Sequence, residues 1–408
     1  MPFGQTTLDK GAPMTTVSRL VSGPLAICVC AAAALWAQEA PAPLADVAAH
    51  DRTRVLKAAD AFLAEPPITI TAFRAEKSAG GIHDYFSQAD YSWPDPAKPD
   101  GLPYVNRDGW SNPDTFQQHR WAMVRLARGV GALGAAFKIT GDRRYAGHAV
   151  THLRAWFVAP GTRMNPSLLY SQAILGSVTG RGVGIIDTIH LIEVAAAIEV
   201  MSARGAISPA DEAPITAWFR DYLTWLTTSE YGVDERERGN NHGTCWVMQV
   251  AAFARMLGDQ ERLAYCRTRY KTWLLPNQMF QDGSFPLEMR RTKPYGYALF
   301  QLDQLATVAQ ILSTPGDNLW SFTLADGRSL KRAVDFMYPF IADKSRWRLP
   351  PDVMYFEYWP VRHASLIFAG LAYREPKYIE LWKRLPADPV MTEIQRNMPV
   401  RYPSLWVD

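Results

Sequence analysis

Apolar residues recur at helical spacing along most of the chain. The segments 51–65, 115–141, 143–159 and 208–228 each carry apolar positions three to four residues apart, with polar residues between them. Strict alternation of apolar and polar residues, which would indicate strands, is scarce. The pattern therefore predicts an all-α chain of roughly a dozen helices, the number of helix-plus-turn units that its length accommodates.

Helix ends are marked by a repeated pair of residues. Gly141 can end one helix while Asp142 caps the next, and Gly258 and Asp259 repeat the device. These helix–turn–helix units share a shape but no repeated sequence. A toroid of stacked helical hairpins, an (α/α) toroid, is the natural single-domain arrangement for so many helices, and we expect it over residues 51–400.

The longest irregular segment runs from residue 78 to 114 and is rich in Pro, Gly, Asp and aromatic residues. Loops of this length in compact domains are usually functional or disordered. The Trp and Tyr content argues against disorder. We therefore expect the segment to line a binding cleft, with four candidate binding residues: His83, Tyr85, Trp93 and Arg107.

A second wall of the cleft is predicted near the C-terminus. The stretch "YFEYWPVRHASL" places Glu357, Tyr358 and Arg362 close together. Aromatic residues are abundant overall, with 14 Trp, 17 Tyr and 17 Phe. Core packing explains most of them, but a carbohydrate cleft would also use some, because sugar rings stack on aromatic faces.

Charge narrows the choice of partner. The chain has 43 Lys and Arg against 40 Asp and Glu, a net charge of +3. This balance gives no reason to expect nucleic-acid binding by bulk charge. It is compatible with a local basic cleft for an acidic substrate.

The N-terminus is typical of an export signal. Arg19 precedes an apolar run that ends in small residues, and cleavage is expected after Ala37. We therefore predict a signal peptide over 1–37, a loose leader over 38–50, and a periplasmic or secreted protein. No membrane anchor is expected after cleavage, since no later run is long and apolar enough to span a bilayer.

The remaining cysteines and a histidine pair point to no metal or cofactor. Cys245 and Cys266 would stay after signal cleavage, as free core thiols or as one disulfide, and two thiols make no zinc site. His148 and His152 lie four residues apart, but no Glu accompanies them in a zincin pattern. We expect them to be exposed helix histidines.

Two polar stretches could carry chemistry. In "ERGNNHGTCW", Asn241 and His242 lie at the entrance of an apolar helix. The simplest interpretation is an asparagine N-cap with an incidental histidine. A helix N-terminus nevertheless also suits an anion, because its free amides and its dipole favour negative charge.

The second stretch, "EMRRTKPYGYALF", lies about fifty residues later. It could be a solvated basic run followed by core tyrosines. Alternatively, its arginines could pair with carboxylates, since an arginine fork binds a carboxylate through two hydrogen bonds. Its candidate binding residues are Arg290, Arg291, Lys293, Tyr295 and Tyr297.

Asn, His, Arg and Tyr together suit β-elimination next to a uronic acid. Removal of the weakly acidic C5 proton builds negative charge on the C6 carboxylate, so donors that neutralise this carboxylate lower the barrier. A base must take the C5 proton and an acid must protonate the leaving O4. A tyrosine whose pKa is depressed by a nearby arginine could serve as the base.

The segments "NNHGTCW" and "GSFPLEMRRTKPYGYALFQLD" resemble signature segments of the alginate lyase-like polysaccharide lyases, and "AGGIHDYFSQADYSWPDP" and "GRGVGIIDT" extend the likeness. The resemblance is closest to the alginate and glucuronan lyases of polysaccharide lyase family 38 and more distant to family 5. It implies an (α/α) toroid and a catalytic set of Asn241, His242, Arg291 and Tyr297, with Tyr297 as base, acid or both.

We therefore predict a polysaccharide lyase whose partner is an acidic uronate polymer. Glu235 or Glu237 could orient His242, and Glu235 is counted among the substrate-binding residues. One alternative is a toroid glycoside hydrolase, which would need two carboxylates flanking the bond. The other is a non-catalytic protein that binds acidic glycans.

Overall fold

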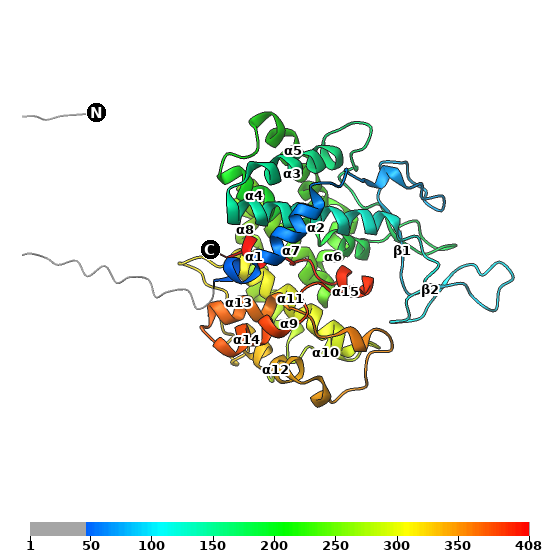
Figure 1. The fold of residues 1–408 in the computed structure, drawn as a ribbon. Helices are drawn as coiled ribbons and strands as arrows, with labels where there is room; N and C mark the ends of the chain where they lie inside the picture. Colours follow the sequence, from blue (N-terminus) through cyan, green and yellow to red (C-terminus); the bar gives the residue numbers. More distant parts are fainter. Residues whose placement is uncertain (1–45, 408) are drawn as a thin grey trace, which may run out of the picture. The chain divides into compact units, whose positions relative to one another are not determined.

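The computed structural model describes residues 46–407, so the expected signal peptide and most of the leader lie outside the described residues. Within this range, no helix is long and apolar enough to cross a membrane. Figure 1 shows the helices in chain order. They are α1 (Val47–Phe62), α2 (Gln118–Thr140), α3 (Arg143–Phe157), α4 (Leu191–Ala203), α5 (Pro209–Thr228), α6 (Glu230–Arg236), α7 (Asn241–Leu257), α8 (Gln260–Arg269), α9 (Leu275–Gln278), α10 (Pro286–Met289), α11 (Pro294–Leu312), α12 (Leu330–Ala342), α13 (Ala364–Ala372), α14 (Pro376–Arg384) and α15 (Thr392–Arg396).

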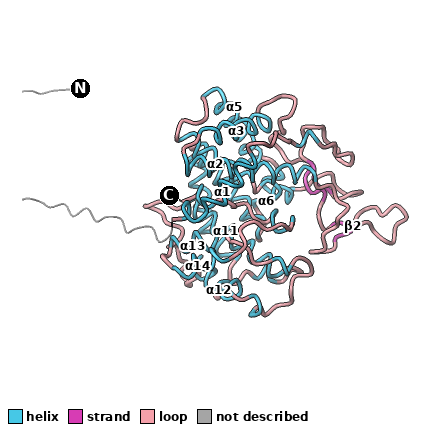
Figure 2. Tube along the Cα trace, in the orientation of Figure 1, coloured by secondary structure: helices cyan, strands magenta, loops and turns pink. Residues whose placement is uncertain are grey.

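The strands of the described residues are short. β1 (Phe86–Gln88) pairs in parallel with β4 (Tyr170–Ala173), and β2 (Ser92–Trp93) pairs antiparallel with β3 (Val105–Asn106). Figure 2 shows these strand segments among the loops on one side of the helices. The all-α prediction is confirmed, and the long loop is irregular apart from these short pairings.

The predicted helix ends are present. Gly141 and Gly258 end α2 and α7 in the left-handed conformation, with φ of 73° and 71°, which glycine adopts without steric cost. The side chain of Asp142 then accepts a hydrogen bond from the Arg144 amide, and Asp259 caps α8 in the same way. Local sequence thus sets these boundaries.

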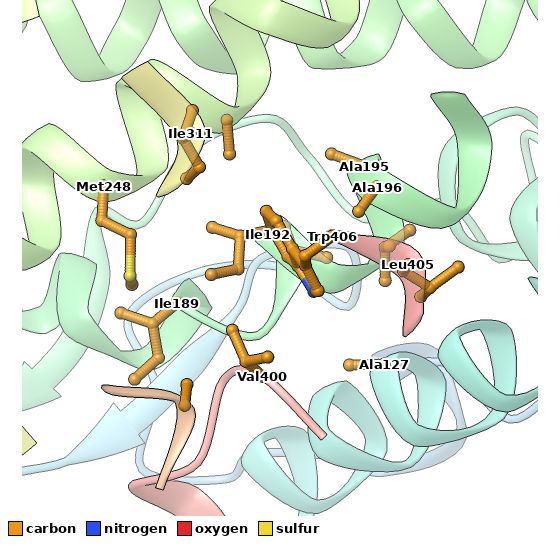
Figure 3. Packing of buried hydrophobic residues seen from close by; sticks show 14 of the residues in the cluster. Ala127, Ile189, Ile192, Ala195, Ala196, Met248, Ile311, Val400, Leu405 and Trp406 are labelled. Atoms are coloured by element: carbon orange, nitrogen blue, oxygen red, sulfur yellow. The ribbon is translucent and has the colours of Figure 1, made fainter. Parts of the chain in front are cut away.

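The core lies between helices that are distant in sequence. α4 packs against both α2 and α7, and α7 packs against α11. Figure 3 shows Ile192 and Ala195 of α4 in one cluster with Ala127 of α2 and Met248 of α7. Ile192 and Met248 are fully buried, and each such side chain stabilises the fold by roughly 1.5–3 kcal/mol.

The packed unit extends beyond the expected domain bounds at both ends. α1 begins at Val47, so the last four residues of the expected leader are helical. At the other end, Trp406 is buried in the core. The carboxylate of Glu193 in α4 also accepts hydrogen bonds from the backbone amides of Arg401 and Tyr402, at 2.7 and 2.8 Å. Both the start of α1 and the C-terminal segment therefore belong to the packed domain, because their apolar and polar groups are buried in it.

Both cysteines and His152 are buried, and His148 is half-buried. Cys245 and Cys266 are both buried free thiols, so the expectation of free core thiols is confirmed and the alternative of a disulfide is not. The prediction of exposed histidines is wrong for His152, which is fully buried in α3. Its Nε2 lies 3.2 Å from Nε2 of His148, and burial followed by the charge of His148 lowers the pKa of His152 to about 4. The pair is therefore part of the packing between α1 and α3.

Candidate active site

The two polar stretches meet in one cleft with a volume of about 270 Å³. The N-termini of α7 and α11 form part of its wall, and the long loop and the segment around α15 complete it. Among the residues that line it are Asn241, His242, Arg291, Lys293 and Tyr297. The four residues expected to act together are thus brought to one place from segments about fifty residues apart.

Asn241 is held by a buried carboxylate. Its backbone amide donates to Oε1 of Glu288 at 2.8 Å, and its side-chain Nδ2 donates to Oε2 at 2.7 Å. Burial raises the pKa of the Glu288 carboxyl, and the hydrogen bonds from Asn241 oppose that shift. Asn240 occupies the N-cap position of α7 without a side-chain cap bond. An asparagine thus occupies the cap position as expected, although its side chain makes no cap bond, and the side chain of the neighbouring Asn241 is oriented by Glu288.

His242 has a carboxylate partner of its own. Its Nδ1 lies 2.8 Å from Oε1 of Glu235, which is fully buried. Burial raises the pKa of Glu235, and the nearby His242 opposes that shift. With Nδ1 directed at this carboxyl group, Nε2 is the ring nitrogen left to meet a substrate. Glu237, the other candidate for this role, binds Arg236 and Arg269 instead.

Arg291 is fixed by the long loop. Its Nε donates to Oδ2 of Asp108 at 3.1 Å, and its Nη2 donates to Oδ1 of the same carboxylate. Nη2 also reaches the hydroxyl of Tyr297 at 3.2 Å, and the guanidinium lies 4.4 Å from the centre of that ring. Burial alone would raise the pKa of Asp108, but the hydrogen bonds and charge of Arg291 lower it. Asp108 is therefore a carboxylate that orients the arginine.

Tyr297 lies in an aromatic and basic environment. Its hydroxyl is 2.8 Å from the hydroxyl of Tyr91, and the amine of Lys293 lies 4.8 Å from the Tyr91 ring and 5.9 Å from the Tyr297 ring. Burial and then Tyr91 raise the pKa of Tyr297 well above its usual value, whereas Lys293 and Arg291 lower it. The expected depression of this pKa is therefore wrong, because burial outweighs both cations. Tyr297 is a neutral phenol.

A buried network of alternating charges supports this side of the cleft. Lys293 binds Glu393 at 2.9 Å, Glu393 binds Arg396 at 3.0 Å, and Arg396 binds Asp90 at 2.7 Å. Arg120 binds the same Asp90 at 2.7 Å. Each charge is thereby compensated, which a buried ion requires. α15 contributes two of these ions, although its sequence lies about a hundred residues from Lys293.

Three predicted binding residues belong to other parts of the fold. Tyr85 is fully buried in the core beside His119. Tyr295 is also fully buried and donates its hydroxyl to the carbonyl of Phe340 at 2.9 Å. Arg362 binds Asp51 of α1 at 2.6 Å. The binding prediction is wrong for these residues, because packing partners that the sequence does not reveal hold them away from the cleft.

The remaining candidate binding residues also do not line the cleft. Nδ1 of His83 lies 2.7 Å from the carbonyl of Arg163, and Arg290 and Tyr358 are exposed. Arg107 stacks on Trp93 at 5.2 Å. Strand geometry explains why Trp93 and Arg107 do not line the cleft. Ser92 and Asn106 pair directly and line it. Because successive side chains of a strand point to opposite faces, their neighbours Trp93 and Arg107 point away from it.

Several cleft residues were missed from the sequence. Tyr91 and Asp108 lie in the long loop, where only their tertiary partners distinguish them from other polar residues. Tyr355 lies three positions before the predicted Tyr358, and Gln172 lies in β4; both line the cleft. Both also have positive φ, 70° and 51°, which is unusual for residues other than glycine and is often found at functional sites.

Comparison with known proteins decides the family. The family model described as alginate lyase matches residues 69–347. This chain belongs to the alginate lyase family. Consistent with this, it is a polysaccharide lyase, and the alternatives of a glycoside hydrolase and a non-catalytic glycan-binding protein are not favoured. No curated protein matches the chain.

Solved structures share the fold of this alginate lyase family member. An alginate lyase from Bacteroides ovatus is 30% identical, with a TM-score of 0.76, over 90% of this chain and 94% of the other. Alginate lyase A1-III from Sphingomonas species A1 is 16% identical, with a TM-score of 0.56, over 90% of this chain and 95% of the other. A variant of the latter was solved in complex with a tetrasaccharide. The predicted single-domain (α/α) toroid is confirmed.

Proposed function

We propose that this lyase cleaves 1,4-linked uronate polymers by β-elimination and leaves 4,5-unsaturated uronate ends. The observation that carries the proposal is the convergence of Asn241, His242, Arg291 and Tyr297 on one cleft. Alginate is the first candidate substrate, because the relative from Bacteroides ovatus is described as an alginate lyase. Glucuronan is the second, since its 1,4-linked residues carry the same C6 carboxylate.

The geometry supports neutralisation of the substrate carboxylate before proton transfer. Nδ2 of Asn241 has a second hydrogen beyond the one given to Glu288, and the Nη1 group of Arg291 makes no hydrogen bond to Asp108. Both donors can reach a C6 carboxylate in the cleft. Their hydrogen bonds strengthen as negative charge develops on C6, which lowers the barrier to removal of the C5 proton.

The two proton-transfer roles follow from protonation states. Tyr297 is a neutral phenol in the free enzyme and can donate its proton to the leaving O4. Nε2 of His242 can accept the C5 proton where that proton lies on the opposite face of the sugar. Where both lie on one face, Tyr297 would serve as base and acid: its phenolate would accept the C5 proton and then donate it to O4. This route requires Tyr297 to lose its proton to solvent beforehand, and the hydroxyl of Tyr91, 2.8 Å away, can donate a hydrogen bond to the phenolate.

We further propose that the protein is exported to the periplasm or secreted. The support is the sequence of residues 1–37, with one arginine before an apolar run and small residues.

A turnover assay on three polymers tests the function. Polymannuronate, polyguluronate and glucuronan are incubated with the enzyme, and new unsaturated ends are followed by ultraviolet absorbance. We expect at least one polymer to give the absorbing product, and the relative rates then identify the preferred uronate. Shortened chains without the double bond would instead indicate hydrolysis and contradict the proposal.

A further inference from the structure

The catalytic cleft adjoins a second cavity next to α15. This cavity has a volume of about 270 Å³, and its lining includes Asp90, Tyr355, Glu393 and Arg396, which also line the catalytic cleft. Its opposite wall is the beginning of α2. The four shared residues thus form a common wall between the two hollows, and a chain that passes over this wall would reach the second cavity.

A groove between α1 and α2 continues the same path. It has a volume of about 450 Å³ and shares Trp121 and Val124 with the second cavity. Its lining also includes Phe62 of α1 and Arg125 and Arg128 of α2. Figure 1 shows α1 lying alongside α2. Three adjoining hollows therefore lead from Tyr297 to Arg128, and we name their outer part, formed by Trp121, Arg125 and Arg128, the α2 track.

The side chains of the α2 track suit an acidic sugar chain. Trp121 is 42% exposed in a helix whose residues 122–124 are buried, so its ring is available for stacking. Residues 121, 125 and 128 recur at helical spacing and share one face over about 10 Å. Arg128 is exposed, and its hydrogen bond within residues 46–407 is a long one of 3.4 Å to Gln395, whereas Arg125 binds Glu65.

The acidic residues along the path do not oppose such a ligand. Asp90 is bound by both Arg120 and Arg396. Glu393 is bound by Lys293 and Arg396. Because these carboxylates are already compensated, the net field at the α2 track comes from its exposed arginine.

We propose that the α2 track binds a distal part of the same uronate polymer whose cleavage site occupies the cleft. A sugar ring would stack on Trp121 and a uronate carboxylate would pair with Arg128. The inference rests on the proposed function for the identity of its ligand. Its own support is the adjacency of the three hollows, which share lining residues, and the pairing of an exposed tryptophan with an exposed arginine on one helix face.

Kinetics on long and short substrates test the α2 track. Trp121→Ala and Arg128→Ala are compared with wild type on a long polymer and on a short oligosaccharide that fills only the cleft. We expect KM for the polymer to rise about tenfold in each variant, the effect of losing one such contact, while kcat and the oligosaccharide kinetics stay unchanged. Arg220→Ala is the matched control, because Arg220 is equally exposed on α5 and its loss removes the same charge.

Two results would overturn the inference. One is a polymer KM that moves less than twofold in both variants. The other is an equal change on polymer and oligosaccharide, which would mean that the substitutions act on the cleft or the fold. If the wild-type enzyme releases no unsaturated ends from any of the polymers, the proposed function itself is contradicted. In that case, the affinity of the α2 track for the polymer can still be measured. Calorimetric titration with polymannuronate compares Tyr297→Phe with Tyr297→Phe/Trp121→Ala, and equal affinities of the two variants would overturn the inference.

Discussion

Tyr295 and Tyr297 lie two positions apart at the start of α11 and have different surroundings. The hydroxyl of Tyr297 meets Tyr91 and Arg291 at the cleft. The ring of Tyr295 packs edge-on against Trp347 with centres 5.0 Å apart, and its hydroxyl binds a backbone carbonyl. Positions two apart on a helix point about 200° apart, which explains the difference. Only one of the two can touch substrate.

We predict that Tyr297→Phe lowers kcat by roughly 100- to 10,000-fold, the usual range for loss of a positioned proton donor. Tyr295→Phe is the matched control and should keep kcat within a few-fold, while it loses about 1 kcal/mol of unfolding free energy with its buried hydrogen bond. Both are measured by initial rates and denaturant unfolding. A Tyr297→Phe enzyme with normal turnover would remove this tyrosine from the mechanism.

The carboxylate of Glu235 determines which nitrogen of His242 faces the cleft. We predict that Glu235→Gln lowers kcat by about 10- to 100-fold, as loss of such a partner does at other oriented histidines, with little change in KM. Glu237→Gln is the control, because Glu237 lies two positions from Glu235 but binds Arg236 and Arg269 rather than His242. Equal effects of the two substitutions would show that Glu235 has no special role.

At the scale of elements, the long loop and the turn before α11 form one unit. The hydroxyl of Thr292 donates to the carbonyl of Asp108 at 2.8 Å, and Arg291 binds the carboxylate of the same residue. Gly109 follows with a φ of 78°, and a Cβ there would lie 2.2 Å from the Thr292 hydroxyl. The loop therefore fits closely on the turn that bears the catalytic arginine.

We predict that Asp108→Asn lowers kcat/KM about tenfold. The amide keeps the shape of the carboxylate but loses the charge-assisted bonds that hold the Arg291 fork. Thermal unfolding should change little, because the pair is only half-buried. Asp100→Asn, a change on an exposed residue of the same loop, is the control. If both variants keep full activity, Arg291 is positioned without the loop.

At the scale of the whole molecule, Glu193 links the central helix α4 to the C-terminal segment. Burial raises the pKa of Glu193 from 4.5 to about 7, although hydrogen bonds from the amides of Tyr402 and Arg401 oppose the shift. The raised value means that the protonated form is favoured in the folded state. Its contribution to stability is complete below pH 4.5 and is lost as pH rises through about 7.

We predict that Glu193→Gln removes this pH dependence. The amide oxygen can accept the same two backbone hydrogen bonds, but the side chain no longer titrates. The difference in unfolding free energy between wild type and variant should shift by about 3 kcal/mol between pH 4.5 and pH 8, to the disadvantage of wild type at high pH. Urea unfolding at several pH values measures it. Parallel curves for the two proteins would show that Glu193 does not titrate with folding.

The sequence by itself determined the helices, many of their ends and the residue types of the site. These features depend on interactions within a few residues: apolar spacing along a helix, a glycine that ends α2, and Asp142 that caps α3. Asn241, His242, Arg291 and Tyr297 were identifiable because each lies in a short stretch of unusual composition.

Only the tertiary structure decided which distant side chains hold these residues. Asp108 lies 183 positions from Arg291, and Tyr91 lies 206 positions from Tyr297. No local pattern encodes such pairs, because they form only when the packing of distant segments brings them together. The protonation state of Tyr297 was decided in the same way. The sequence shows an arginine nearby, which would lower the pKa, but only the fold shows the burial that outweighs it.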